Sequence, residues 1–146
     1  MMRNRESEVL VGRRYLSQGF IDEAMRLFSR NVSRVSAGDW TRLAGELMAR
    51  GRIGEVVRVC TMGGVPLPRE QLLARGDEHL RRKDVDDAIY FYELAGADRA
   101  RWSRMVDVLT SLPERELRAI DIAKRYLVEE DEDDGVFPLP LLAAAE

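Results

Sequence analysis

Apolar residues recur three and four positions apart along most of the chain, with polar residues between them. The pattern is clearest in residues 72–95, LLARGDEHLRRKDVDDAIYFYELA, where polar residues at 81–84 separate two apolar stripes. Apolar residues at this spacing cover one face of an α-helix, and a short polar interruption is typical of a turn. The sequence therefore predicts two helices joined by a tight turn in this region.

The same pattern recurs upstream at shifts of 32 and 64 residues. Five columns keep the size and polarity of their residues: Gly12 with Ala44 and Gly76, Tyr15 with Leu47 and His79, Ile21 with Ile53 and Val85, Ala24 with Val56 and Ala88, and Phe28 with Cys60 and Tyr92. Small residues let two helices approach closely, and a ring fills the space beside them. The sequence therefore predicts repeated helical hairpins, with units near residues 5–36, 37–68 and 69–100.

Turn and cap signals divide the first two units into helices. In the first unit they predict helices over about residues 7–17 and 22–34. In the second unit Ser36 and Asp39 have the spacing of a variant capping box, which starts a helix, and Gly51 marks the turn. The second unit is expected to end at Gly63, Gly64 and the segment Pro66-Leu67-Pro68.

A fourth helical pair, over residues 101–128, is expected to cap the repeats. Its first helix is lined by Trp102, Met105, Val106 and Leu109, and its second by Leu117, Ile120, Ala123, Lys124 and Leu127. Ser111 and Glu114 are spaced as a capping box around Pro113, which predicts that the second helix starts there. A terminal unit presents one face to water, and the charged positions Arg115, Arg118, Asp121 and Arg125 fit that role.

Composition indicates one soluble helical domain followed by an acidic tail. The net charge of −3 is uneven, because residues 129–146 carry seven acidic residues and no basic one, which leaves a surplus of +4 on residues 1–128. We expect a flexible tail at 129–146, which either folds back onto a basic surface or only improves solubility. Because no apolar run is long enough for a membrane span and the first ten residues are too charged for a signal peptide, we expect a cytoplasmic protein.

Catalytic chemistry has little support in the sequence. The single histidine, His79, and the single cysteine, Cys60, both stand in packing columns, and Trp40 and Trp102 fall on apolar faces. We find no glycine-rich phosphate loop and no metal-ligand spacing, and we read the acidic group at 84–87 as a helix start. The sequence therefore predicts neither an enzyme nor a bound cofactor or metal.

The repeated residues resemble the tetratricopeptide repeat pattern. The resemblance covers about residues 5–100 and rests on Gly12, Tyr15, Gly19, Ala24, Phe28, Trp40, Leu43, Ala44, Leu47, Gly51, Pro68, Gly76, Ala88, Tyr92 and Ala95. The period of 32 is shorter than the 34 residues of that family, and Val56 and Cys60 replace its usual alanine and large ring. The resemblance implies an all-α, right-handed α-solenoid of three to four antiparallel hairpins.

In that family the first helices line a concave groove that binds a peptide or helix of another protein. Carried over by position, the partner-binding residues here would be Val9, Arg13, Leu16, Ser17, Thr41, Gly45, Met48, Ala49, Leu73, Asp77, Leu80 and Arg81. Tyr90 is added as a separate partner contact, because it projects away from the apolar stripe of its own helix. Val9, Thr41 and Leu73 replace the lysine and asparagine of members that bind chaperone C-termini, so that type of partner is not expected.

The sequence therefore favours a non-catalytic scaffold or adaptor that binds an amphipathic or acidic segment of another protein. Self-association is left open. The alternative is an RNA-binding repeat of the pentatricopeptide kind, which Arg50-Gly51-Arg52-Ile53 and Gly64-Val65-Pro66 resemble. Against RNA binding, the basic surplus of the body is small and faces an acidic tail.

Overall fold

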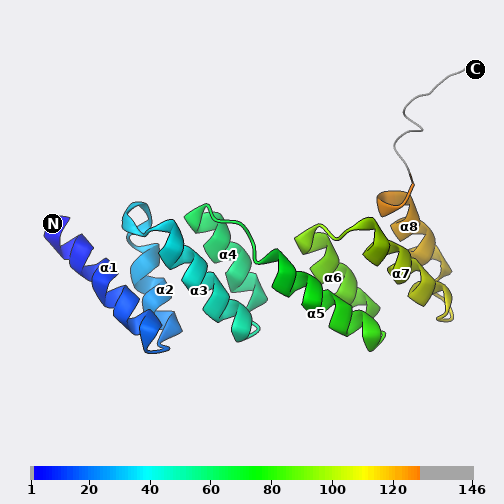
Figure 1. The fold of residues 1–146 in the computed structure, drawn as a ribbon, viewed down its shortest axis with the longest axis horizontal. Coiled ribbons are helices and arrows are strands. Elements are labelled where there is room, and N and C mark those ends of the chain that lie inside the picture. The colour runs from blue at the N-terminus through cyan, green and yellow to red at the C-terminus, as the bar shows by residue number, and fades with distance from the viewer. Residues whose placement is uncertain (1, 129–146) are drawn as a thin grey trace, which may run out of the picture. The chain divides into compact units, whose positions relative to one another are not determined.

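The structure, a computed structural model, describes residues 2–128, with side chains from residue 5 onward. This part of the chain is all-α and contains no strand (Figure 1). Its helices are α1 (Met2–Ser17), α2 (Ile21–Ser29), α3 (Ala37–Ala49), α4 (Ile53–Gly63), α5 (Arg69–Arg81), α6 (Val85–Ala95), α7 (Arg99–Thr110) and α8 (Glu116–Tyr126), with a short 3₁₀ helix, η1 (Val32–Arg34), after α2. The acidic tail expected at 129–146 lies outside the described residues.

The chain divides into two compact units, and the boundary falls inside α5, between Leu72 and Leu73. In the first unit α1 packs against α2 and α3 against α4, and in the second unit α7 packs against α8. In the second unit α5 also packs against α6, because Gly76 of α5 lies against the ring of Tyr92 of α6. Consecutive helices thus form the hairpins that the periodicity predicted.

The hairpin turns repeat the same backbone geometry. Gly19, Gly51 and Lys83 stand 32 residues apart, and their φ angles are 87°, 73° and 67°. Glycine adopts this left-handed conformation without penalty, whereas a residue with a Cβ is strained in it. Lys83 is therefore the unfavourable residue in a position that the other two hairpins give to glycine.

Close contacts between paired helices follow the predicted columns. A Cβ added to Gly12 would lie 2.7 Å from a ring carbon of Phe28, and one added to Gly76 would lie 2.5 Å from a ring carbon of Tyr92. In the middle repeat the equivalent residues are Ala44 and Cys60, and both are buried. A larger residue on the first helix is thus accompanied by a smaller one on the second, which keeps the shared space filled.

The prediction of a helix over 22–34 is wrong at its end. The helix α2 stops at Ser29, and η1 follows after Asn31. The buried Asn31 amide explains the break, because its Nδ2 donates to Leu27 O at 2.8 Å and to Glu8 Oε1 of α1 at 2.9 Å. A side chain that bonds the backbone four residues earlier competes with continuation of the helix.

The cap at the start of α3 is confirmed, whereas the one expected before α8 is wrong. Ser36 Oγ accepts a hydrogen bond from the backbone N–H of Asp39 at 3.1 Å. Ser111 Oγ instead donates to Val108 O at 2.6 Å, which closes the end of α7. Glu114 has a φ of 64°, and α8 begins only at Glu116.

The inward face of α8 also differs from the predicted stripe. Ala119 and Ile122 are buried, whereas 83% of Leu117 and 51% of Ile120 are exposed. The reason is the stacking of Tyr126 on Trp102 of α7, with ring centres 3.9 Å apart and planes 3° apart. This contact fixes the rotation of α8 about its axis and turns Leu117 and Ile120 to solvent.

None of the helices within residues 2–128 has the length and apolar content needed to cross a membrane. Trp40 and Trp102 are buried, as expected for core residues.

Candidate partner-binding surfaces

A hollow of about 430 Å³ lies in the second unit, over α5 and α7, which are the first helices of its two hairpins. Its lining comes from α5, the turn after α5, α6 and α7, and consists of Asp77, Leu80, Arg81, Lys83, Tyr92, Arg104 and Val108. Three of the predicted partner-binding residues, Asp77, Leu80 and Arg81, are thus brought together here.

Asp77 is already occupied by neighbouring side chains. The Arg101 guanidinium donates from Nε to Oδ1 and from Nη2 to Oδ2, both at 2.9 Å, and the Tyr92 hydroxyl donates to Oδ1 at 2.5 Å. These hydrogen bonds hold the pKa of Asp77 below its ordinary value, and the bond from Arg101 has the largest effect. Burial, and then the bond to Asp77, raises the pKa of Tyr92. This carboxylate therefore holds α5 against α7 and has little capacity left for a partner.

The cations that line the hollow have fewer side-chain partners than Asp77. Arg81 pairs with Glu78 of its own helix. Within residues 2–128, the side chains of Lys83 and Arg104 form no hydrogen bond and no ion pair. Leu80 is buried and Val108 is half-buried, so an apolar base lies next to two cations that have no hydrogen-bond or ion-pair partner, although the charge of Arg104 helps to lower the pKa of Asp77.

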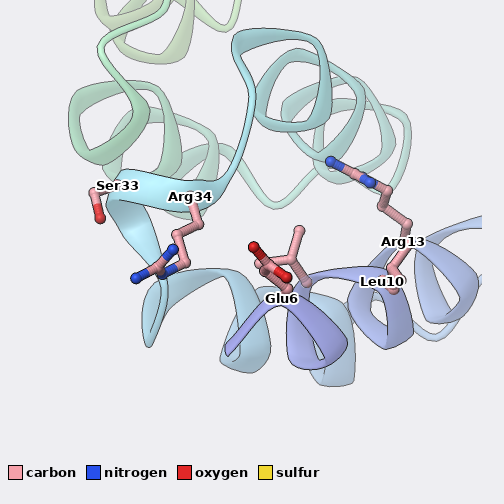
Figure 2. A pocket seen from close by; sticks show the side chains of 6 residues that line it. Glu6, Leu10, Arg13, Ser33 and Arg34 are labelled. Carbon is pink, nitrogen blue, oxygen red and sulfur yellow. The ribbon is translucent and has the colours of Figure 1, made fainter. Parts of the chain in front are cut away.

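A second hollow, of about 520 Å³, lies in the first unit. Figure 2 shows Glu6, Leu10 and Arg13 on α1 and Ser33 and Arg34 on η1, and Val9 completes the lining. Leu10 is 57% exposed, and it also lines a neighbouring hollow with Arg13, Arg14, Ser17 and Gln18. An exposed leucine beside arginines makes this surface both apolar and cationic, like the hollow of the second unit.

The predicted partner-binding residues differ in how exposed they are. Val9, Leu16, Met48, Leu73 and Leu80 are buried, Arg13 pairs with Asp39, and Ser17, Thr41, Gly45, Ala49, Arg81 and Tyr90 are exposed. Thr41 and Met48 line none of these hollows, and Tyr90, on α6, is 48% exposed with its ring edge-on to Phe91. A binding role for any of them stays a prediction.

Sequence reasoning missed Leu10, Lys83, Arg104 and Val108. The sequence does carry a signal for Lys83. It stands in the turn column that holds Gly19 and Gly51, where a lysine is strained, and such a residue is a candidate for a functional role. The sequence carries no such signal for Arg104, because its place in the hollow depends on how α7 packs against α5.

The single histidine and cysteine are placed as packed side chains. The His79 ring stacks on Phe91, with ring centres 5.4 Å apart, and its Nδ1 lies 3.6 Å from Asp84 and 3.9 Å from Asp87. Cys60 is buried, and burial raises the pKa of its thiol, which disfavours the reactive thiolate. Within residues 2–128 no group of three or more His, Cys, Asp or Glu side chains is placed to hold a metal ion.

Comparison with protein-family models, with curated proteins and with solved structures found no match to this chain.

Proposed function

We propose that the chain is a non-catalytic, tetratricopeptide-like interaction module that binds an acidic, amphipathic segment of another protein. The observation that carries this proposal is the hollow of the second unit, where the unpaired cations Lys83 and Arg104 lie beside Leu80 and Val108. A segment with carboxylates on one side and apolar side chains on the other matches both features.

The charges inside the hollow favour an anionic occupant. Asp77 is the one acidic residue of the lining, and its charge is already compensated by Arg101. The remaining charged residues are Arg81, Lys83 and Arg104, so an approaching carboxylate meets three cations. A cationic or purely apolar segment would leave Lys83 and Arg104 without an ion-pair partner.

The first unit supports the same chemistry independently. The exposed Leu10 lies between hollows that are lined by Arg13, Arg14 and Arg34. Arg13 keeps its pair with Asp39, so Leu10 and Arg14 would make the contact.

A binding titration tests the proposal. The probe is a fluorescein-labelled helical peptide of glutamate and leucine, followed by anisotropy with the full chain. We expect the double variant Lys83→Gln with Arg104→Gln to raise the dissociation constant about tenfold, since each unpaired cation contributes roughly 0.5–1 kcal/mol. Arg26→Gln is the matched control, because Arg26 is an exposed cation of α2 outside these hollows, and it should leave the affinity within about twofold.

Two outcomes would contradict this function. The first is a peptide affinity that does not respond to the loss of Lys83 and Arg104. The second is tighter binding of a labelled single-stranded RNA than of the peptide, which would favour the RNA-binding alternative.

A further inference from the structure

Residues 129–142, which we call the tail segment, combine a run of carboxylates with a run of apolar side chains. Residues 129–134 are six acidic residues in succession, and after Gly135 the stretch 136–142 reads VFPLPLL. No other part of the sequence has more than two acidic residues in succession. Carboxylates next to apolar side chains are what the proposed function requires of the segment that binds the hollow of the second unit. The chain therefore contains a segment with the chemistry of that partner.

The hollow offers matching groups that the described part of the chain leaves unused. Within residues 2–128 the side chains of Lys83 and Arg104 form no ion pair, and Leu80 and Val108 supply an apolar base. Lys83 also holds a φ of 67°, in a turn position where the first two hairpins have glycine. Backbone strain of this kind is found most often at binding and active sites. A cation kept in a strained turn without an ion-pair partner indicates that an anionic group binds there.

The tail segment is attached close enough to reach this hollow. The helix α8 ends at Tyr126, whose ring stacks on Trp102 of α7, and the Val128 N–H bonds back to Ala123 O at 2.9 Å. Arg104 follows Trp102 by two residues and therefore projects from nearly the opposite side of α7. A helix with its side chains is about 10–12 Å across, and six extended residues span about 20 Å. The acidic run is thus long enough to pass around α7, which brings its last carboxylates to Arg104.

We infer that the tail segment of the same chain occupies the hollow of the second unit and competes there with the partner. The last carboxylates of the acidic run bind Lys83 and Arg104. Phe137 and Leu139 then cover the apolar base. A segment tethered this close has an effective concentration on the order of 1 mM, so a weak contact is enough to hold it. The competition rests on the proposed function, because it needs a partner of the same chemistry, whereas the occupancy does not.

Zero-length cross-linking of the full chain tests the occupancy. A water-soluble carbodiimide joins a lysine amine to a carboxylate in direct contact, and Lys83 and Lys124 are the only lysines of the chain. Residues 129–146 contain no basic residue, so trypsin leaves them in one peptide whose cross-links mass spectrometry identifies. We expect a cross-link from Lys83 to this peptide in the monomer fraction. Lys124 is the internal reference, because it stands close to the acidic run in sequence and its cross-link needs no docking.

A variant that keeps every charge separates docking from general charge attraction. Phe137→Ser with Leu139→Ser, called the tail variant, should lower the ratio of Lys83 to Lys124 cross-links several-fold, because the apolar contacts with the hollow are lost. Its affinity for the glutamate–leucine peptide should rise several-fold, since the competing segment leaves the hollow more often. An unchanged ratio together with an unchanged affinity would overturn the inference.

Two further variants complete the test. Leu117→Ser with Ile120→Ser is the matched control, because it removes two large exposed apolar side chains of α8 outside the hollow and should change neither measurement. Lys83→Gln with Arg104→Gln weakens the tail segment and the peptide alike. Its cost in peptide affinity should therefore be larger in the tail variant than in the native chain, and an equal cost in both would contradict a shared site.

The outcomes separate this inference from the proposed function. A Lys83 cross-link without any peptide binding would support the occupancy and reject the proposed function. Peptide binding that depends on Lys83 and Arg104, with no Lys83 cross-link and no gain in the tail variant, would overturn the inference and leave the proposed function standing. A Lys83 cross-link found only in dimers would also overturn it, because the tail segment of a second copy would then be the occupant.

Discussion

Arg13 and Asp77 occupy the same place in repeats 64 residues apart, and each forms an ion pair although their charges are opposite. Arg13 of α1 donates from Nε to Asp39 of α3 at 2.8 Å, whereas Asp77 of α5 accepts from Arg101 of α7. Each pair joins the first helix of one hairpin to the first helix of the next. The position thus keeps an ion pair to the next hairpin while the sign of its charge is reversed.

Removal of Arg101 should loosen the second unit. We expect Arg101→Gln to lower the free energy of unfolding by about 1–2 kcal/mol, because a forked, charge-assisted contact to the half-buried Asp77 is lost. Urea unfolding followed by circular dichroism measures the change. Arg101→Lys should recover only part of the loss, since an ammonium group cannot make the fork.

The same pair predicts a pH dependence of stability. Since the pKa of Asp77 in the folded protein lies below its ordinary value of 3.8, the pair contributes its stability above about pH 4. That contribution is lost as the pH falls through the lowered pKa and the carboxylate takes up a proton. We expect Asp77→Asn to be less stable than the native chain at neutral pH, and the difference to shrink near pH 3. An equal difference at both pH values would contradict this assignment.

A methyl group at Gly76 should be costly. Its Cβ would lie 2.5 Å from the buried Tyr92 ring, so we expect Gly76→Ala to destabilise the protein by about 2 kcal/mol through overpacking. Gly45→Ala is the matched control, because Gly45 lies inside α3 with no atom within 4 Å of an added Cβ. There the substitution should stabilise by about 1 kcal/mol through helix propensity. Thermal or urea unfolding of both variants would show the opposite signs.

The left-handed backbone at Lys83 predicts a conflict between stability and binding. Lys83→Gly should raise the free energy of unfolding by about 1 kcal/mol, because glycine adopts a φ of 67° without strain. The same change removes an unpaired cation from the hollow, so peptide affinity should fall. Glu114→Gly, at a φ of 64° and outside the hollow, should stabilise the protein without weakening peptide binding.

Local patterns were sufficient to predict the helices and the pairing of consecutive helices, but not the end of α2 or the start of α8. Apolar spacing indicates a helix wherever it persists, and Gly19 and Gly51 mark turns because their conformation is set within one or two residues. The Gly12 and Phe28 column was also readable, since a small residue and a ring at a fixed spacing describe two helices that touch.

The tertiary structure alone decided which face of a helix is covered and which charges are paired. The sequence offers α8 two apolar faces, and the stacking of Tyr126 on Trp102 buries Ala119 and leaves Leu117 exposed. Asp77 reads as an available groove residue until Arg101, 24 positions away, is found bound to it. Both outcomes depend on neighbours that are distant in sequence, because helical periodicity specifies a face but not what packs against it.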